Sequence, residues 1–438
     1  MPRIVTRARR LEGELRVPSD RSITVRAMLL AALAQGKSRI RRPLEAGDTL
    51  AAQGVLKRLG VAHSYDLAAE ELVVVGRGLH GLRPASASAS SPVTISCGSS
   101  GATLRLMAGV LAGQSFASVL DGSAQLRARP MRRLTRPLRA LGATLEDTSG
   151  HAPLYLQPTV LRGGKLTLPQ ASAQVVSALL LAGLYARDSV EVTVPCPVRD
   201  HTSLLLAAMG AEIHMEPHWH RVAPPEGELE PLDLRVPGDF SSAAFFLVAG
   251  TLLPGDLTLR EVGLNPTRSG LLEALAAMGA PVAVIERDPS GPERVADLVP
   301  RRRPLSGVTI AGALSANMMD ELPVLAVAAT QAAGTTVVRD ARELRVKESD
   351  RIRAMVRELS AMGAVIEERA DGFVIEGPRP LKGATVHAHG DHRVAMALSV
   401  AALVADGPTT IRGAEAVGKT YPQFFDHLER VDGEAQDK

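Results

Sequence analysis

The chain has 438 residues, of which 45% are hydrophobic, 22% are charged and only 3% are aromatic, with a formal net charge of +3. This length exceeds one ordinary domain core, so two domains are expected. The scarcity of aromatic rings argues against stacking on nucleic-acid bases, and no nucleic-acid partner is expected. Two cysteines provide neither a disulfide framework nor a zinc-site spacing, which is typical of a reducing compartment. Without a secretory pattern or a membrane-spanning apolar run, a cytoplasmic protein with no membrane contact is expected.

A pattern of strand, polar turn and apolar helix recurs along the chain, which indicates an internal repeat. Residues 15–22 read LRVPSDRS and residues 234–241 read LRVPGDFS, and an Ala/Leu-rich helix follows both. Looser copies begin at Val93, Leu166, Val308 and Thr385. A second, more exposed helix follows most copies, and its predicted end is a glycine that takes a left-handed conformation cheaply. These glycines are Gly60, Gly142, Gly210, Gly279 and Gly363.

The copies predict six units of roughly 70 residues, each with a strand, a buried helix, a strand, an exposed helix and a strand. The two closest copies enclose units two and three. We therefore expect one domain from residues 1–18 plus 238–438 and a second from residues 19–237. Residues 81–92 and 287–304 are predicted to be irregular loops that face solvent.

Charged residues stand at the entrances of several helices that are otherwise apolar. Arg26, Arg105 and Arg393 each come early in such a helix. A helix N-terminus presents free N–H groups and the positive end of the helix dipole, so several such starts facing one cleft would bind an anion. For a single copy, the alternative is that Asp20 and Ser22 cap the helix while Arg26 extends to solvent. The recurrence of this pattern favours an anion site.

Two motifs suggest other functions but lack the context that those functions need. Gly76, Gly78 and Gly81 spell GxGxxG, but the residues after them cannot start the helix that a dinucleotide site requires. Residues 387–392 (HAHGDH) match a metal-hydrolase signature, yet His427 is the only later histidine in the chain. Because a metal site needs its full set of ligands, neither a metal nor a cofactor is expected.

A dense charged run, residues 345–351 (RVKESDR), is predicted to open the second helix of the fifth unit. Alone, such a run is typical of a solvated helix start with supporting salt bridges. However, Asp320 lies in an apolar segment, and Arg129 precedes another second-helix start. Several cations near helix N-termini suit a ligand with phosphate and carboxylate groups. A buried Asp or Glu among them would be able to move protons at neutral pH.

These segments together resemble the 5-enolpyruvylshikimate-3-phosphate synthase family (3-phosphoshikimate 1-carboxyvinyltransferases) over nearly the whole chain. The motifs are LRARPM from Leu126, ASAQVVSALLLAGL from Ala171, GLNPTRSGLL from Gly263, MMDELPVLAVAA from Met318, RVKESDR from Arg345 and GDHRVAM from Gly390. The resemblance implies an α/β fold, a two-domain inside-out α/β barrel. Each domain would contain three βαβαββ units about a pseudo-threefold axis, with the active site in the interdomain cleft. It also implies a monomer.

The resemblance implies transfer of the enolpyruvyl group of phosphoenolpyruvate to the 5-hydroxyl of shikimate-3-phosphate, with release of phosphate. This reaction belongs to the shikimate pathway to chorismate and aromatic amino acids. The residues implied to hold shikimate-3-phosphate are Arg21, Ser22, Arg26, Ser172, Gln174, Arg199, Asp320 and Lys347. Arg26 suits the carboxylate of this substrate, and Ser172, at a helix start, suits its phosphate.

Phosphoenolpyruvate is implied to lie on the turn 98–101. The residues implied around it are Arg21, Gly101, Arg129, Gln174, Arg351, Arg393 and Lys419. Asp320 is implied to be the base on the 5-hydroxyl, while Lys347 and Glu348 handle the proton that is added to and removed from the enol carbon. Cations around both substrates would stabilise the charged transition state in a closed, dry cleft.

The chain departs from the family pattern at two turns. The family's Gly-Ser-Lys-Ser turn is Ser19-Asp20-Arg21-Ser22 here, so an arginine replaces a lysine that contacts both substrates. The usual Asn and Thr of the second turn are Ser99 and Ala102. Residues 172–174 (SAQ) and 199–202 (RDHT) resemble the bacterial group that is often insensitive to glyphosate. We therefore expect weakened glyphosate binding.

Three alternative functions remain open from the sequence. The sister family transfers enolpyruvyl to UDP-N-acetylglucosamine and carries a reactive cysteine a few residues before its Arg-Pro pair, where this chain has Ala124. A catalytically silent anion-binding homologue is the second alternative, because of Arg21. A metal hydrolase built on residues 387–392 is the third.

Overall fold

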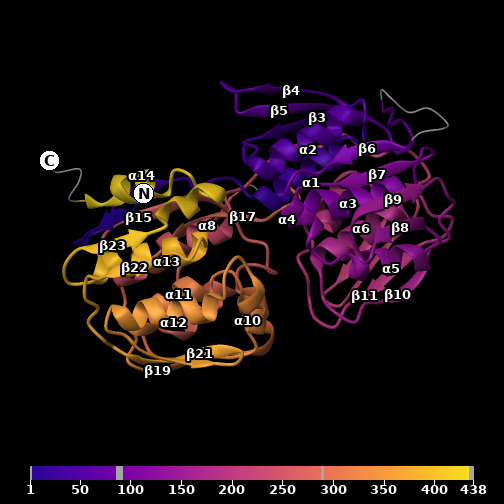
Figure 1. The fold of residues 1–438 in the computed structure, drawn as a ribbon. Helices are drawn as coiled ribbons and strands as arrows, with labels where there is room; N and C mark the ends of the chain where they lie inside the picture. The colour runs from indigo at the N-terminus through magenta and orange to yellow at the C-terminus, as the bar shows by residue number, and fades with distance from the viewer. Residues whose placement is uncertain (1, 85–91, 288–290, 434–438) are drawn as a thin grey trace. The chain divides into compact units, whose positions relative to one another are not determined.

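The computed structural model describes residues 2–84, 92–287 and 291–433 (Figure 1). The chain forms two compact units, each with its own hydrophobic core. Unit 1 comprises Met1–Pro18, Pro237–Pro289 and Arg294–Lys438, and unit 2 comprises Ser19–Val236 and Ser290–Glu293. Within the described ranges, no helix is both long and apolar enough to cross a membrane.

Unit 2 contains three four-stranded sheets among its described residues. Its strands are β3 (Gln35–Arg41), β4 (Ala62–Asp66), β5 (Glu71–Arg77), β6 (Val93–Ser96), β7 (Ser118–Asp121), β8 (Thr144–Thr148), β9 (His151–Gln157), β10 (Gly164–Thr167), β11 (Val190–Thr193), β12 (Ile213–Glu216), β13 (Trp219–Val222) and β14 (Asp233–Arg235). Its helices are α1 (Arg21–Ala31), α2 (Gly47–Arg58), α3 (Gly101–Ala112), α4 (Ala124–Arg127), α5 (Arg132–Ala140), α6 (Ala173–Gly183) and α7 (His201–Ala208). The sheet orders are β14-β3-β5-β4, β6-β7-β9-β8 and β10-β11-β13-β12.

In the part of unit 1 that the structure describes, two sheets have four strands and one has three. The strands are β1 (Arg3–Val5), β2 (Gly13–Leu15), β15 (Leu257–Gly263), β16 (Ala283–Arg287), β17 (Val295–Val299), β18 (Thr309–Ile310), β19 (Gly334–Val338), β20 (Val365–Arg369), β21 (Gly372–Gly377), β22 (Thr385–His387) and β23 (Thr409–Arg412). The helices are α8 (Phe240–Leu252), α9 (Gly270–Ala277), α10 (Gly312–Asn317), α11 (Leu322–Thr330), α12 (Arg351–Ala361), α13 (His392–Val404) and α14 (Phe424–Val431), with 3-10 helices η1 (Arg342–Val346) and η2 (Ala414–Lys419). The sheet orders are β16-β17-β15-β2, β18-β19-β21-β20 and β1-β23-β22.

The repeated unit is a βαβαββ motif, which confirms the fold class that the resemblance implied. In the second of the six repeats, β6 and β7 pair in parallel and the buried helix α3 connects them. The exposed helix α5 then leads into the antiparallel hairpin of β8 and β9. The residue pattern alone predicted one strand after the exposed helix, whereas the structure has this two-stranded hairpin. Parallel strands need a long crossover, which α3 provides here, whereas antiparallel strands need only a short turn.

The two closest sequence copies exchange their first strands. Strand β2 precedes α1 in the chain but pairs in parallel with β15. Strand β14 precedes α8 but pairs in parallel with β3. Strand β2 therefore belongs to a sheet of unit 1 although α1 belongs to unit 2, and β14 belongs to a sheet of unit 2 although α8 belongs to unit 1. The chain passes between the units after residues 18 and 236.

The apolar helices pack together inside each unit. In unit 2, α3 packs against α1 and α6, and in unit 1 the helices α8, α11 and α13 pack pairwise (Figure 1). This packing explains why these helices are apolar on every side. The exposed helices end as predicted, because the glycine after each one has a positive φ of 74–97°. These glycines are Gly60, Gly142, Gly210, Gly279 and Gly363.

One of the two loop predictions is wrong. Within 287–304, Val295–Val299 forms β17, and four of its five residues are buried. Asp297 interrupts the apolar run of this strand, which hid the strand pattern in the sequence. In the other predicted loop, residues 81–84 are irregular, although Leu82 is buried, and residues 85–91 lie outside the described ranges.

Candidate active site

Helix α1 begins directly after an aspartate that caps it. The Oδ1 atom of Asp20 accepts a hydrogen bond of 2.8 Å from the backbone N–H of Ile23. Asp239 takes the same place before α8 and accepts a hydrogen bond of 3.0 Å from the backbone N–H of Ser242. Part of the polar helix entrance is therefore an ordinary N-cap. Arg26 is different, because it is only 2% exposed and does not extend to solvent.

Hydroxyl groups from three helices surround the guanidinium group of Arg26. Its Nε donates to Thr202 on α7 at 2.9 Å, and its Nη2 donates to Ser177 on α6 at 3.4 Å. Its Nη1 donates to the hydroxyl of Ser22 and, at 3.2 Å, to the carbonyl of Ser22. Two predicted residues, Ser22 and Arg26, therefore lie together. Thr202 and Ser177 were not predicted, since their motifs do not show which hydroxyls meet Arg26.

Two further residues predicted for shikimate-3-phosphate lie at helix starts in the same unit. Ser172 is the N-cap residue of α6, but its side chain makes no capping hydrogen bond. Arg199 lies half-buried two residues before α7. A helix start combined with a hydroxyl group and a guanidinium group suits an anionic group such as a phosphate.

Three residues predicted for phosphoenolpyruvate meet around the start of α3. Gly101 is the first residue of this helix, and a Cβ placed on it would lie 2.7 Å from Nη1 of Arg105 and 3.0 Å from Nη1 of Arg129. Nη1 of Arg105 also donates to Oε1 of Gln174 at 2.7 Å. Gly101, Arg129 and Gln174 therefore gather around Arg105, a residue that the sequence analysis noted but gave no role.

Arg21, which replaces the family's lysine, forms an ion pair within its own unit. Its Nη1 lies 3.1 Å from Oδ2 of Asp48 on α2, and the Arg21 side chain is 49% exposed. Ser99, at the second departure from the family pattern, is exposed and its hydroxyl lies 3.0 Å from that of Ser123. Arg21, at the start of α1, and Ser99, just before α3, are therefore both accessible.

In unit 1, one buried arginine contacts three carboxylates. Nε of Arg351 lies 2.8 Å from Asp391, Nη1 lies 3.2 Å from Asp320 and Nη2 lies 2.6 Å from Glu348. Burial opposes the charge of Arg351, but the carboxylates, with Asp391 first, raise the pKa of its guanidinium group above the ordinary value. Burial alone would raise the pKa of Asp391, yet Arg351 holds that pKa below its usual range.

The predicted base Asp320 lies between two arginines. Besides Arg351, Nη2 of Arg393 on α13 lies 3.6 Å from its Oδ2. The next residue, Glu321, is 2% exposed; it accepts a hydrogen bond from Ser241 and lies 4.0 Å from Nη1 of Arg393. Burial raises the pKa of Glu321 above its ordinary value even though Arg393 favours its charge. Glu321 and Asp391 were not predicted, because as single letters in their motifs they resemble any acidic residue.

The two predicted lysines differ in their local structure, because Lys347 lies outside any helix and Lys419 is the last residue of the 3-10 helix η2. The run 345–351 was predicted to open a helix, but Lys347 and Glu348 lie between η1 and α12, and only Arg351 belongs to α12. Asp350 caps this helix through the backbone N–H of Arg353, which sets its start at Arg351. Nζ of Lys347 donates to Glu343 at 2.6 Å, and Nζ of Lys419 donates to the carbonyl of Gly390 at 2.9 Å.

The histidine-rich segment 387–392 has structural contacts. Nε2 of His389 lies 2.8 Å from Glu358, which also accepts a hydrogen bond from the backbone N–H of His387. Asp391 caps α13 and pairs with Arg351. Across the described ranges, no group of three or more His, Cys, Asp or Glu side chains is arranged to hold a metal ion.

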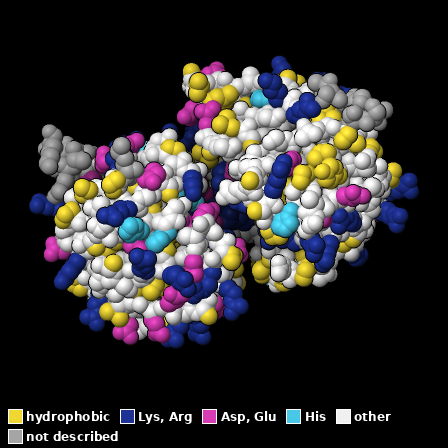
Figure 2. Space-filling model, viewed as in Figure 1, with side chains coloured by type: hydrophobic (Ala, Val, Ile, Leu, Met, Phe, Trp, Pro, Cys, Tyr) yellow, Lys and Arg dark blue, Asp and Glu magenta, His cyan; other side chains and the backbone are white. Residues whose placement is uncertain are grey.

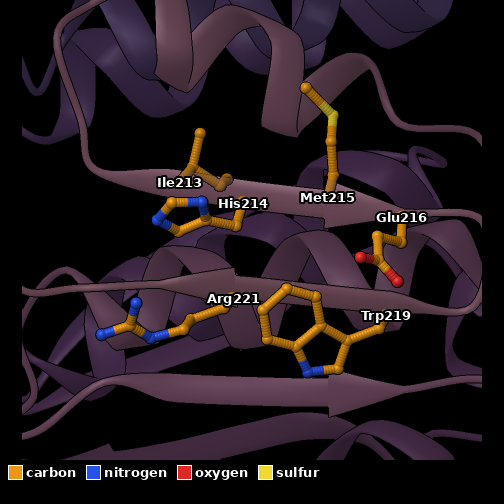
Figure 3. A pocket seen from close by; sticks show the side chains of 6 residues that line it. All are labelled: Ile213, His214, Met215, Glu216, Trp219 and Arg221. Atoms are coloured by element: carbon orange, nitrogen blue, oxygen red, sulfur yellow. The ribbon is translucent and has the colours of Figure 1, made fainter.

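A surface hollow of about 470 Å³ lies on the hairpin of β12 and β13 and is lined by Ile213, His214, Met215, Glu216, Trp219 and Arg221. The side chains of Ile213 and Met215 point away from those of Trp219 and Arg221 (Figure 3). None of the predicted site residues lines this hollow. Basic and acidic side chains are interspersed over the visible face of each unit, in line with the small net charge (Figure 2).

Comparisons with known proteins agree along the whole chain. The profile of the family described as EPSP synthase (3-phosphoshikimate 1-carboxyvinyltransferase) matches residues 5–428. The 3-phosphoshikimate 1-carboxyvinyltransferase of Gloeobacter violaceus is 49% identical over 432 residues, which cover 98% of each chain. That of Roseiflexus castenholzii is 47% identical over 430 residues, covering 97% of this chain and 98% of its own. The solved structure of EPSP synthase from Acinetobacter baumannii has a TM-score of 0.91 at 37% identity, covering 99% of this chain and 98% of its own. The chain therefore belongs to the EPSP synthase (3-phosphoshikimate 1-carboxyvinyltransferase) family.

Proposed function

We infer that this protein transfers the enolpyruvyl group of phosphoenolpyruvate to the 5-hydroxyl of shikimate-3-phosphate and releases phosphate. The observation that carries this inference is family membership across residues 5–428, with relatives of 47% and 49% identity over nearly the full chain. The reaction belongs to the shikimate pathway to chorismate and aromatic amino acids. The same relatives do not favour UDP-N-acetylglucosamine as the acceptor.

For the chemical steps, we propose that Asp320 removes the proton of the 5-hydroxyl while the oxygen of that hydroxyl bonds to C2 of phosphoenolpyruvate. Lys347 and Glu348 deliver a proton to C3 and later remove one, so that the C–O bond to phosphate breaks and the double bond returns. Arg351 supports this assignment, since its Nη1 contacts Asp320 and its Nη2 contacts Glu348. One guanidinium group thereby orients two carboxylates, one acting on the proton of the 5-hydroxyl and the other on the proton at C3 of phosphoenolpyruvate.

For the substrates, we propose that the cluster around Arg26 holds shikimate-3-phosphate and the cluster around Gly101 holds phosphoenolpyruvate. The residues that complete the first set are Arg21, Ser22, Ser172, Gln174 and Arg199 of unit 2 and Asp320 and Lys347 of unit 1. The residues that complete the second set are Arg21, Arg129 and Gln174 of unit 2 and Arg351, Arg393 and Lys419 of unit 1. Guanidinium and helix-start N–H groups support the assignment because both substrates are multiply anionic.

The deciding experiment measures phosphate release from phosphoenolpyruvate with shikimate-3-phosphate, with UDP-N-acetylglucosamine, or with no acceptor. Release only with shikimate-3-phosphate is expected, and release only with the sugar nucleotide would refute the assignment. Asp320→Asn should lower kcat at least about 100-fold. The matched control, Asp256→Asn, removes an 85% exposed carboxylate of the same unit and should leave kcat unchanged.

We also propose that the enzyme acts as a monomer in the cytoplasm, as the resemblance implies. In support, each unit has a hydrophobic core of its own, as a chain that folds without a second copy requires. Light scattering on the eluting peak of a sizing column gives the mass in solution. A mass of one chain, 46.2 kDa, is expected, and twice that mass would refute the proposal.

A further inference from the structure

Arg105 is a buried cation in an apolar helix. It lies in the first turns of α3 and is 3% exposed. Its recorded hydrogen bonds go to uncharged oxygens, namely Oε1 of Gln174 at 2.7 Å and the carbonyl of Gly101 at 3.2 Å. Its Nε has no hydrogen-bond partner among the described residues. A buried charge without a carboxylate partner is costly, so its presence calls for a functional reason.

The electrostatic surroundings of Arg105 add to this cost. Burial first, and then the positive charges of Arg133 and Arg129, lower the pKa of Arg105 to about 10. The guanidinium group therefore stays charged at neutral pH, but it lies in a region of excess positive charge. An anionic ligand would relieve this repulsion, whereas an empty site leaves it in place.

Arg105 also determines which end of the Gln174 amide is available to a ligand. An arginine has only N–H donors, so the amide oxygen of Gln174 must face Arg105. The NH₂ group of Gln174 is then left to point elsewhere. A ligand beside Gln174 therefore meets hydrogen-bond donors, which select for carboxylate or phosphate oxygens.

We propose that Arg105 is a positioning residue for phosphoenolpyruvate binding, which fixes the Gln174 amide so that its NH₂ group faces the anionic substrate. This inference rests on the proposed function, since it concerns the same substrate site. Gly101, Arg129 and Gln174 all lie next to Arg105, which makes it the shared support of this cluster. Arg105 acts through Gln174 rather than on the reacting atoms.

The test is a double-mutant cycle with Arg105→Met, Gln174→Met and the double variant. Each single change should raise the KM for phosphoenolpyruvate about tenfold, because one donor to a charged group is lost or misdirected. The double variant should bind no more weakly than Gln174→Met, since both changes remove the same interaction. If the two increases in KM for phosphoenolpyruvate multiply in the double variant, the proposal is overturned.

Gln174→Glu separates positioning from simple structural support. A carboxylate keeps its contact with Arg105 and should leave the melting temperature equal or higher, yet it presents no donor to the substrate. The KM for phosphoenolpyruvate should therefore rise at least tenfold, with a smaller change in kcat. A wild-type KM in this variant would overturn the proposal. Where Arg105→Met does not fold, Arg105→Gln, whose amide can either donate to or accept from Gln174, replaces it in the cycle.

Arg133→Met is the matched control for charge. It removes a neighbouring positive charge that adds to burial in lowering the pKa of Arg105, and it leaves the hydrogen bond between Arg105 and Gln174 in place, so the KM for phosphoenolpyruvate should change less than threefold. A tenfold rise would mean that net charge, not positioning, is responsible. The wild-type reaction is measured first. Absence of shikimate-3-phosphate-dependent release refutes the proposed function, and the cycle is then scored on phosphoenolpyruvate binding by calorimetry. If the wild-type protein releases phosphate normally but the KM effects of Arg105→Met and Gln174→Met multiply in the double variant, only the proposed role of Arg105 is refuted.

Discussion

Nε of Arg351 lies 2.8 Å from Oδ2 of Asp391, and their side chains are only 1% and 0% exposed. These residues are 40 positions apart in the chain, and they join the start of α12 to the start of α13. Two further carboxylates, Asp320 and Glu348, contact the same guanidinium group. The arginine therefore offsets part of the negative charge of these carboxylates, of which only Asp391 is fully buried, and so lowers their mutual repulsion.

Removal of this arginine should destabilise the protein as well as inactivate it. Arg351→Met leaves Asp391 buried without its cation, and we expect a loss of about 3 kcal/mol in the free energy of unfolding at pH 7. Asp391→Asn added to this variant should recover part of the loss. Urea unfolding measures both. Arg301→Met, which breaks a pair that is 48% exposed on the arginine side, is the control and should cost under about 1 kcal/mol. Equal losses in the two arginine variants would contradict the buried-cluster interpretation.

Gly101→Ala should affect substrate binding without affecting the fold. Its Cβ would meet the guanidinium ends of Arg105 and Arg129, which are flexible enough to move aside. Since alanine also favours a helix, the melting temperature should hardly change. The displaced arginines should raise the KM for phosphoenolpyruvate about tenfold, as steady-state kinetics will measure. Gly54→Ala, in α2 with open space around its Cβ, should leave that KM at the wild-type value.

The ion pair between Arg21 and Asp48 should compete with the substrate for Arg21. Because the arginine side chain is 49% exposed, the pair contributes at most about 1 kcal/mol. Asp48→Asn should therefore lower the KM for phosphoenolpyruvate, and the inhibition constant of glyphosate, by no more than about fivefold. Asp233→Asn, which breaks an exposed pair with Arg41 in the same unit, is the matched control. A rise in KM for Asp48→Asn would instead mean that Asp48 helps to orient Arg21 for binding.

Asp297 should make folding stability depend on pH in acid. Burial opposes its charge, but hydrogen bonds from Arg287, the Glu261 backbone and Arg260 lower the pKa of Asp297 to about 2. A lowered carboxyl pKa stabilises the folded state above about pH 4, and this stabilisation disappears as the pH falls towards 2. Asp297→Asn should thus cost on the order of 2 kcal/mol at pH 7 and far less near pH 2, by denaturant unfolding. Asp256→Asn, which changes an 85% exposed carboxylate of the same unit, should show no such difference.

Features that depend on neighbouring residues were predictable from the sequence. The N-caps Asp20 and Asp239 act within three residues, and the left-handed glycines end the exposed helices within one turn. Repetition of these short signals was enough to predict six repeats, and the resemblance to the family implied the α/β class. The signal failed at β17, because a buried Asp297 with two arginine partners looks like a loop residue in a hydrophobicity pattern.

The resemblance to the family supplied the roles of the site residues, and the tertiary structure alone shows what each one contacts. Arg105 and Gln174 are 69 residues apart, and no local pattern links a buried arginine to one particular amide. Likewise, HAHGDH matches a metal signature, although His389, on a turn, contacts Glu358 of α12.

The sequence by itself determined the repeat, the helix ends and the family of this protein, because backbone preferences and burial patterns act over a few residues. Only the tertiary structure decided the exchange of β2 and β14 and the carboxylate partners of Arg351. It alone also decided the orientation of Gln174 by Arg105. These depend on which elements pack side by side, and a charged side chain reaches whichever acceptor that packing brings within hydrogen-bond distance.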